Sequence, residues 1–194
     1  MSPKEYLAIV HCIAGLKEHT RHAWMKSGRQ ESVAEHSWRL ALMAYFMHDA
    51  FPRADRWRVL LMALLHDIGE VFTGDIPTFE KTAADRTREH RMRDEWIAGL
   101  PAPYHDEIRS LFDEMDACET QEAKLIRALD RMEAVITHNE GDPATWLPLE
   151  YDLQRSYGLQ EAAFSPALRA LRTQINIEVD DVISSLNKKK ETTI

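Results

Sequence analysis

The sequence predicts an all-α bundle of roughly seven to nine helices, and three observations support that prediction. Glycine is scarce, at 7 of 194 residues, whereas leucine, alanine, methionine, glutamate and arginine, which favour helices, are abundant. Apolar residues recur at helical spacing along most of the chain. No stretch reads as a strand. A chain of this length can bury about 70% of its unfolded surface in one domain.

The first part of the chain divides at a polar segment. In residues 1–18 the apolar side chains recur at helical spacing, which predicts an amphipathic helix with a broad apolar face. Residues 19–32 break that pattern, and a polar connection of this length is either functional or a solvated loop. Ser32, followed three residues later by Glu35, predicts a capping box that starts a second helix over residues 33–51.

The later helices are separated by prolines and glycines. They are expected over residues 55–66, 79–100, 104–117, 120–139, 142–157 and 167–186. Pro52, Pro101 and Gly158 lie between neighbouring members of this series, as residues that end helices. We therefore expect a single domain over residues 1–187, followed by a polar, disordered tail over residues 188–194.

Charge and cysteine usage narrow the class of protein. The net charge of -8 argues against general binding to nucleic acid. Cys12 and Cys118 form no motif, which suits a reducing compartment. No apolar run approaches the length that spans a membrane, and no targeting segment is recognisable. The expectation is a soluble, cytoplasmic protein that has neither nucleic acid nor membrane as a partner.

The most informative stretch is VLLMALLHDIGEVFTGD, residues 59–75. Seven consecutive apolar residues run into His66 and Asp67, and a helix that is apolar on every side is expected to be buried. A buried carboxylate needs a cationic partner, several hydrogen bonds or a metal ion. Gly69 and Gly74 suggest that the chain turns here and aims several side chains at one point. Taken alone, the stretch is explained equally well by a hydrogen bond between His66 and Asp67 in the core.

Two more polar residues face the same expected core. His36 is the polar member of the apolar stripe of the second helix, and Asp130 lies on the shoulder of the stripe over residues 120–139. Each could be an ordinary core residue whose polar atoms are paired. Together with His66 and Asp67, however, they supply two imidazoles and two carboxylates. Such a set can bind a first-row divalent cation and leave positions open for water or substrate.

The order H…HD…D formed by these four residues resembles that of the HD-domain metal-dependent phosphohydrolases. The segments ESVAEHSWRLALMA, LLHDIGEVFTGDIPT and EAKLIRALDRMEA look like the branch that contains the bacterial and human 5'-deoxynucleotidases. Arg21 and Trp24, upstream of the first histidine, match the same branch. The similarity spans roughly residues 16–139.

The resemblance implies a role for each matching residue. The metal ligands would be His36, His66, Asp67 and Asp130. They would hold one divalent ion, which could be Mn, Co, Fe, Ni, Zn or Mg. Glu70 would handle the proton of the attacking water, and Asp75 would act near the leaving group. Arg21 would bind the substrate phosphate, and Trp24 would shape that pocket. The family resemblance further implies an HD-domain helical bundle that is often a homodimer.

The sequence therefore predicts a phosphoric monoester hydrolase, a 5'-deoxynucleotidase acting on 2'-deoxynucleoside 5'-monophosphates. The alternatives are an HD-domain hydrolase of another phosphoester and a catalytically silent, nucleotide-sensing HD protein. The presence of Glu70, Asp75 and Arg21 in the matching motifs speaks against a silent protein. A two-iron oxygenase is disfavoured, because only His90 could start a second histidine cluster, and a surface position is expected for His90.

Overall fold

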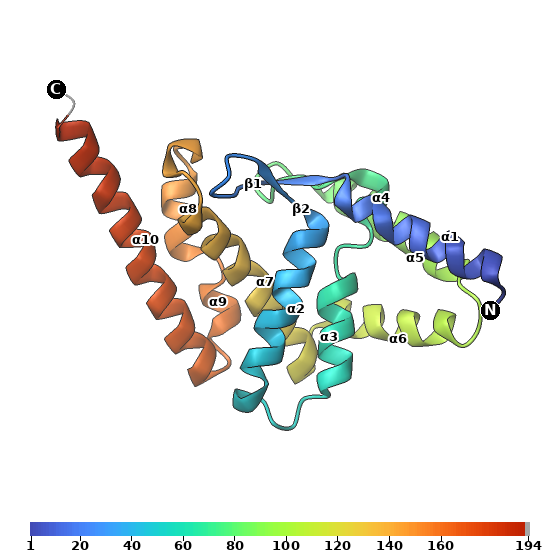
Figure 1. Cartoon of the computed structure of the whole chain (residues 1–194). Helices are drawn as coiled ribbons and strands as arrows, with labels where there is room; N and C mark the ends of the chain where they lie inside the picture. Colours follow the sequence, from blue (N-terminus) through green and yellow to red (C-terminus); the bar gives the residue numbers. More distant parts are fainter. Residues whose placement is uncertain (193–194) are drawn as a thin grey trace. The chain divides into compact units, whose positions relative to one another are not determined.

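The computed structural model describes the backbone of residues 1–192 and the side chains of residues 1–186 (Figure 1). Its internal contacts define two compact units. The first unit contains residues 1–22 and 31–126, and the second unit contains residues 23–30 and those from 127 onward. The single domain expected over residues 1–187 stays a prediction.

Helices dominate both units, as the sequence predicts. The α-helices are α1 (Pro3–Ala14), α2 (Val33–Met47), α3 (Arg56–Leu65), α4 (Glu70–Thr73), α5 (Ala83–Ala98), α6 (Tyr104–Ala117), α7 (Gln121–Glu140), α8 (Glu150–Ser156), α9 (Leu159–Ala162) and α10 (Pro166–Thr192). Short 3-10 helices are η1 (Gly15–Lys17), η2 (His48–Ala50) and η3 (Pro143–Thr145). Because α4 and α9 have only four residues each, eight longer α-helices remain in the described part of the chain. None of the helices within residues 1–192 is both long and apolar enough to cross a membrane.

The polar segment after α1 is a β-hairpin, which corrects the expectation that the chain has no strand. β1 (Thr20–Trp24) pairs with β2 (Gln30–Ser32) in a two-stranded sheet. In the turn, the Met25 N–H donates to the Arg29 carbonyl, and Gly28 has a φ of 82°, in the left-handed region that favours glycine. Strands of five and three residues are too short to display a clear alternation of polar and apolar residues.

α3 is buried on one side only, which corrects the expectation that it is buried all round. Val59, Met62 and Ala63 are buried, whereas Trp57 is 73% exposed and Leu64 is 44% exposed. The exposed residues lie on the helix face opposite the buried ones. The apolar segment of α3 therefore contains more apolar residues than the core of the first unit covers.

Two predicted helices are shorter than their patterns suggested. α5 starts after Thr82, where Thr82 and Asp85 form a capping box, and not earlier in the charged segment. The helix expected over residues 142–157 divides into η3 and α8. Trp146 is extended (φ -71°, ψ 133°), and Pro148 disfavours helical geometry in the residue before it. α10 is longer than expected and reaches Thr192, and residues 193 and 194 of the predicted tail lie outside the described residues.

The core of the first unit anchors the turn between α3 and α4. Its buried members are Leu16, Val33, Ile68, Ile97, Leu100, Ile108 and Phe112. Ile68, which is completely buried, lies in the turn itself, between Asp67 and Glu70. Burial of this one side chain therefore determines where the polar residues on either side of it point.

The second unit has its own buried residues on α7 and α10. The apolar ones include Leu129, Met132, Val135, Leu168, Ile175 and Val179. Among them lies Arg172, which is 1% exposed. Its guanidinium donates to the carbonyl oxygens of Gln154 (2.6 Å) and Tyr157 (2.9 Å), and to Asn176 Oδ1 (2.6 Å). These hydrogen bonds join α10 to the end of α8 and satisfy a buried cation.

Gly141, just after α7, allows β1 to approach closely within the second unit. A Cβ at this position would lie 2.1 Å from the Trp24 carbonyl oxygen, a distance at which the backbone must move. We expect Gly141→Ala to destabilise the protein by about 1–3 kcal/mol, the usual cost of overpacking. Urea unfolding measures the change. As a control, Gly99→Ala should be close to neutral, because its Cβ would meet no atom closer than 3.4 Å. Equal stability of Gly141→Ala and wild type would contradict the expected clash.

Candidate metal centre and active site

The turn after α3 presents the predicted His-Asp pair. His66 is the C-cap of α3, and buried Ile68 anchors the residues that follow. The Glu70 N–H donates to the Asp67 carbonyl at 2.9 Å, which closes the turn into α4. Gly74 ends α4 with a φ of 74°. The chain therefore turns between His66 and Gly74, as the glycines in this stretch predict.

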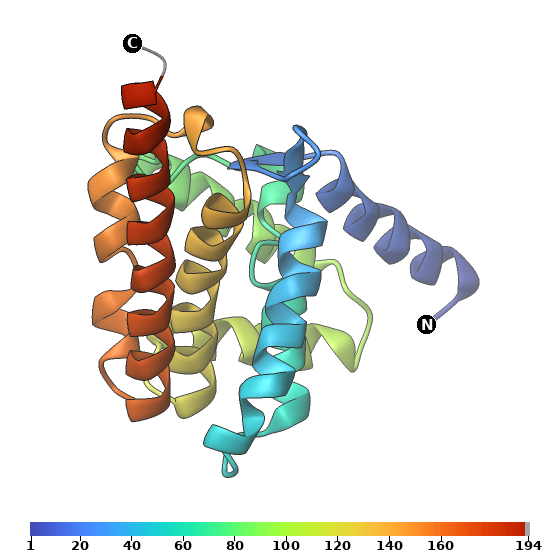
Figure 2. The ribbon, with the colours of Figure 1, turned by 60° about the vertical axis from the view of Figure 1, so that its left-hand side comes forward.

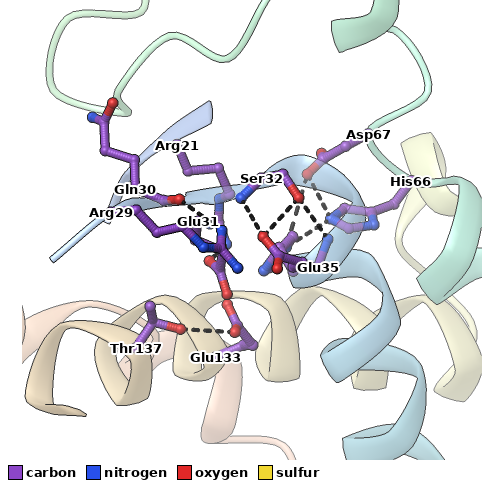
Figure 3. A network of polar contacts seen from close by, with 11 residues as sticks. Arg21, Arg29, Gln30, Glu31, Ser32, Glu35, His66, Asp67, Glu133 and Thr137 are labelled. Atoms are coloured by element: carbon purple, nitrogen blue, oxygen red, sulfur yellow. Dashed lines mark hydrogen bonds and ion pairs between the residues drawn. The ribbon is translucent and has the colours of Figure 1, made fainter. Parts of the chain in front are cut away.

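His36 reaches the same place from α2. Ser32 Oγ accepts from the Glu35 N–H at 3.3 Å, and the Glu35 carboxylate accepts from the Ser32 N–H at 3.0 Å (Figure 3). This is the predicted capping box, and it determines where α2 begins. His36 lies one turn later and is completely buried. Its Nε2 is 3.2 Å from Nε2 of His66.

Three ligand atoms from two elements have the spacing that a bound metal ion would require. Asp67 Oδ2 lies 3.0 Å from His66 Nε2 and 3.8 Å from His36 Nε2. Ligand atoms held 2.0–2.2 Å from one ion lie roughly 2.8–3.6 Å from each other in tetrahedral or octahedral geometry, so both distances to His66 Nε2 fit, and the distance from Asp67 Oδ2 to His36 Nε2 is 0.2 Å longer than this range. His66 Nδ1 is 3.0 Å from the Ala63 carbonyl oxygen, so that this contact orients the ring and leaves Nε2 to face the other two ligands. These residues could therefore hold a divalent cation.

Two predicted site residues belong to the second unit. Asp130 lies in the middle of α7, where its side chain is half-buried. Trp24 is the last residue of β1 and is also half-buried. Because Asp130 and the other three proposed ligands belong to different units, the role of Asp130 as a fourth ligand stays a prediction. The role of Trp24 in shaping the phosphate pocket stays a prediction as well.

Glu70 is buried beside the three ligand atoms, and its two carboxylate oxygens have different surroundings. Oε1 is 3.6 Å from Lys81 Nζ, while Oε2 is buried without a hydrogen-bond partner among the described residues. Burial raises the pKa of Glu70 to about 10, and the charges of Asp67 and Asp75 add to this effect, while Lys81 opposes it. Without a bound cation this carboxyl group is therefore protonated at neutral pH; a divalent ion held by the neighbouring ligands would lower its pKa and let the carboxylate accept a proton from a nearby water.

Arg21 and Asp75, both in the first unit, interact through their charges. Burial raises the pKa of Asp75, and the Arg21 guanidinium opposes that shift. Arg21 Nη1 also donates to Glu31 Oε2 at 3.2 Å across the hairpin (Figure 3). The His19 carbonyl accepts from the Val33 N–H, so the strand that carries Arg21 begins beside the start of α2. The ion pair with Glu31 therefore fixes the position of the Arg21 guanidinium.

The sequence reasoning missed Lys81 and Glu89. Lys81 Nζ lies 2.5 Å from Glu89 Oε2, and both side chains are largely buried. A single lysine near Asp75 gives no periodic signal. The sequence signal that could have identified Lys81 is that it follows the predicted catalytic residue Asp75 by only a few residues. His90, the next residue, is exposed, as expected.

Comparison with known proteins identifies relatives over most of the chain. The model of the HD domain matches residues 13–172. The 5'-deoxynucleotidase hdd1 of Schizosaccharomyces pombe is 29% identical over 148 residues, which cover 70% of this chain and 73% of that protein. The human 5'-deoxynucleotidase HDDC2 is 28% identical over 143 residues, which cover 71% of this chain and 68% of the human protein.

Two solved structures with a fold similar to that of this chain are also described as phosphohydrolases. A protein described as a predicted metal-dependent phosphohydrolase, from Magnetospirillum magnetotacticum, has a TM-score of 0.75 and 26% identity. That match covers 92% of this chain and 93% of the other. The cyanophage S-2L HD phosphohydrolase DatZ, solved with dA and one catalytic Zn²⁺, has a TM-score of 0.53 and 20% identity, covering 95% of this chain and 96% of its own. The likeness to DatZ is one of fold.

Proposed function

Because this chain belongs to the HD-domain family, we propose that it is a metal-dependent 5'-deoxynucleotidase. It hydrolyses 2'-deoxynucleoside 5'-monophosphates to deoxynucleoside and inorganic phosphate. The observation that carries the proposal is the convergence of His36, His66 and Asp67 beside buried Glu70. Relatives named 5'-deoxynucleotidase support the same substrate class.

The residues meet the needs of phosphate monoester hydrolysis, which are compensation of negative charge, an oriented water and a group that manages protons. His36, His66 and Asp67, together with Asp130, would hold one divalent ion, which would supply positive charge and Lewis acidity. Glu70 accepts the proton of the attacking water through Oε2. Asp75 assists the leaving oxygen. Arg21 binds the phosphate through its planar guanidinium.

The proposal is tested by kcat/KM for matched deoxy- and ribonucleoside 5'-monophosphates, together with di- and triphosphates and a 3'-monophosphate. A tight sugar pocket that leaves a 2'-hydroxyl unpaired costs about 1–3 kcal/mol, so we expect a preference of roughly 5- to 150-fold for the deoxy form. Equal rates on both sugars would leave a 5'-nucleotidase without sugar selectivity. Absence of hydrolysis of every monophosphate with metal bound would favour another phosphoester or a silent sensor.

Arg21→Lys tests the phosphate contact. The substitution keeps the charge but removes the planar fork of donors, so we expect kcat/KM to fall roughly 10- to 100-fold. Steady-state kinetics measure this. Arg29→Lys is the matched control, because Arg29 lies in the same hairpin and donates to the Gln30 carbonyl at the exposed surface. Wild-type kinetics of Arg21→Lys would remove Arg21 from the substrate site.

Two features of the cellular form complete the proposal. Cys12 and Cys118 are both free, as suits a reducing compartment, and we place the enzyme in the cytoplasm. We also propose that the chain functions as a homodimer, the assembly that its family resemblance implies. Its partner molecule in the reaction is the small nucleotide, and the net charge of -8 disfavours nucleic acid.

A further inference from the structure

α2 and α3 together expose an apolar face on the first unit. This surface, called the α2–α3 face, consists of Trp38, Leu42, Tyr45, Phe46, Trp57 and Leu64, each between 41% and 77% exposed. The two helices pack side by side (Figure 1). The rings of Tyr45 and Phe46 meet edge to face at 5.3 Å, and the Arg56 guanidinium of α3 lies 5.4 Å from the centre of the Tyr45 ring. The face is therefore continuous across both helices.

The size and composition of the α2–α3 face are those of a protein interface. An aromatic residue offers about 150–250 Å² of surface, so the exposed fractions of its four aromatic members amount to roughly 400–650 Å². The largest apolar patch of a typical monomer is about 300–600 Å². With the two leucines added, the upper end of this range approaches the ~800 Å² that each partner buries in a standard interface. Exposed Trp, Tyr and Phe beside an arginine are also the residue types that dominate binding energy.

Charge favours a second copy of this chain as the occupant. The chain has a net charge of -8, but α2 and α3 together contain three Arg and only one acidic residue, Glu35. Two copies can therefore join here without bringing their excess negative charge together. We propose that the α2–α3 face of one copy packs on the same face of another around a two-fold axis. This inference rests on the proposed homodimer and is independent of the proposed hydrolysis.

α1 carries the competing surface. It has no buried residue, and it extends away from the other helices of the first unit (Figure 2). Its exposed apolar residues include Tyr6, Leu7, Val10 and Ile13. Only one of these is aromatic, so the α1 surface offers fewer of the residues that anchor interfaces. It provides a matched control in the same protein.

The test is the oligomeric state of Phe46→Glu/Trp57→Glu, measured by sedimentation equilibrium over a range of concentrations. Both side chains are more than 70% exposed, so the variant should fold, which circular dichroism and thermal unfolding verify. We expect wild type to be a dimer. The dimer dissociation constant should rise by roughly 30-fold or more for each interface residue replaced. Leu7→Glu/Val10→Glu should remain dimeric.

A monomeric wild type would overturn the inference, as would a dimer that persists in Phe46→Glu/Trp57→Glu. If only the Leu7→Glu/Val10→Glu variant dissociated, the interface would lie on α1, and the inference would be overturned as well. Deoxynucleotidase activity is measured separately in each variant. A folded, active monomer would reject the interface and leave the proposed hydrolysis intact, so the two failures are distinguishable.

A second, independent observation concerns Lys81, which lies between two buried acids. Its Nζ is 2.5 Å from Glu89 Oε2 of α5 and 3.6 Å from Glu70 Oε1 of α4. All three side chains are at least 85% buried. Gly69 makes this approach possible, because a Cβ there would lie 2.7 Å from Glu89 Cγ. Glu70 Oε2 is not engaged by the lysine.

The geometry assigns Lys81 as a positioning residue for Glu70, with Glu89 as the anchor of Lys81. The ammonium group fixes Oε1 of Glu70 and so directs Oε2 toward the position of the attacking water. Lys81 acts through Glu70 and does not itself touch the substrate. The assignment rests on the proposed function, because it concerns the group that accepts the proton of that water.

Lys81→Met tests the assignment. We expect kcat to fall about 10- to 100-fold with KM changed by less than about threefold, and Lys81→Arg to recover most of the loss. Arg91→Met is the control, because Arg91 of α5 forms an exposed ion pair with Glu95. An unchanged kcat, or a change in KM alone, would overturn the assignment. A crystal structure of Lys81→Met with Glu70 in its original rotamer would overturn it as well, even if the wild type proved inactive.

Discussion

Glu70→Gln is expected to lower kcat by roughly 10²–10⁴-fold while the protein keeps its fold and its metal. The glutamine amide retains the size of the side chain but cannot accept a proton from water. Glu70 is also unnecessary for charge balance at the metal, since Asp67 and Asp130 are the proposed acidic ligands. Steady-state kinetics and elemental analysis of the same preparation separate the two properties.

Glu80→Gln is the matched control for this experiment, because Glu80 is a nearby, exposed glutamate. It should have wild-type kcat and metal content. Wild-type turnover by Glu70→Gln would reject the role of Glu70 in proton transfer. Loss of metal in proportion to the loss of activity would instead make Glu70 a ligand.

His66→Ala is expected to empty the metal site and abolish activity, because it removes the nitrogen that lies closest to both other ligand atoms. Elemental analysis should show about one divalent ion per wild-type chain and almost none in the variant. A ligand that binds only the folded state stabilises it by about 2.7 kcal/mol at 100 times its dissociation constant. The wild-type melting temperature should therefore rise with added metal, and that of His66→Ala should not.

Asp130→Ala extends the metal experiment to the fourth proposed ligand, and it should lose metal in the same way. His90→Ala, in the exposed part of α5, should keep it. Full occupancy of the metal site in His66→Ala would contradict the whole ligand assignment. Full occupancy in Asp130→Ala alone would limit the centre to the three residues that converge in the first unit.

The parts of the site that sequence could predict are governed by local rules. The capping box of Ser32 and Glu35 depends on residues three apart, and the end of the turn after His66 depends on Gly74, whose φ of 74° favours glycine. Helical spacing placed His36 on the buried side of α2. Each inference needed only the chemistry of a short segment, and the order of the motifs then indicated the family.

The remainder depends on contacts between distant segments, which no local pattern records. β1 and β2 are too short to show an alternating pattern, so the sequence predicts a loop where the structure has a hairpin. Lys81 resembles any solvated lysine until the fold brings Glu89 against it. The exposure of Trp57 and Leu64 depends on how much of α3 its neighbours cover, and an apolar run alone cannot reveal that.

The position of Ile68 determines how this centre responds to stress. The residue is completely buried in the core of the first unit, and the backbone hydrogen bonds around it also hold Asp67 and Glu70. The free energy of local opening is highest for segments whose backbone hydrogen bonds and side chains belong to the core. The turn cannot become mobile unless that core opens too. Heat or denaturant should therefore not produce a population of folded chains with a disordered centre, so that the geometry of the centre lasts as long as the unit that contains it.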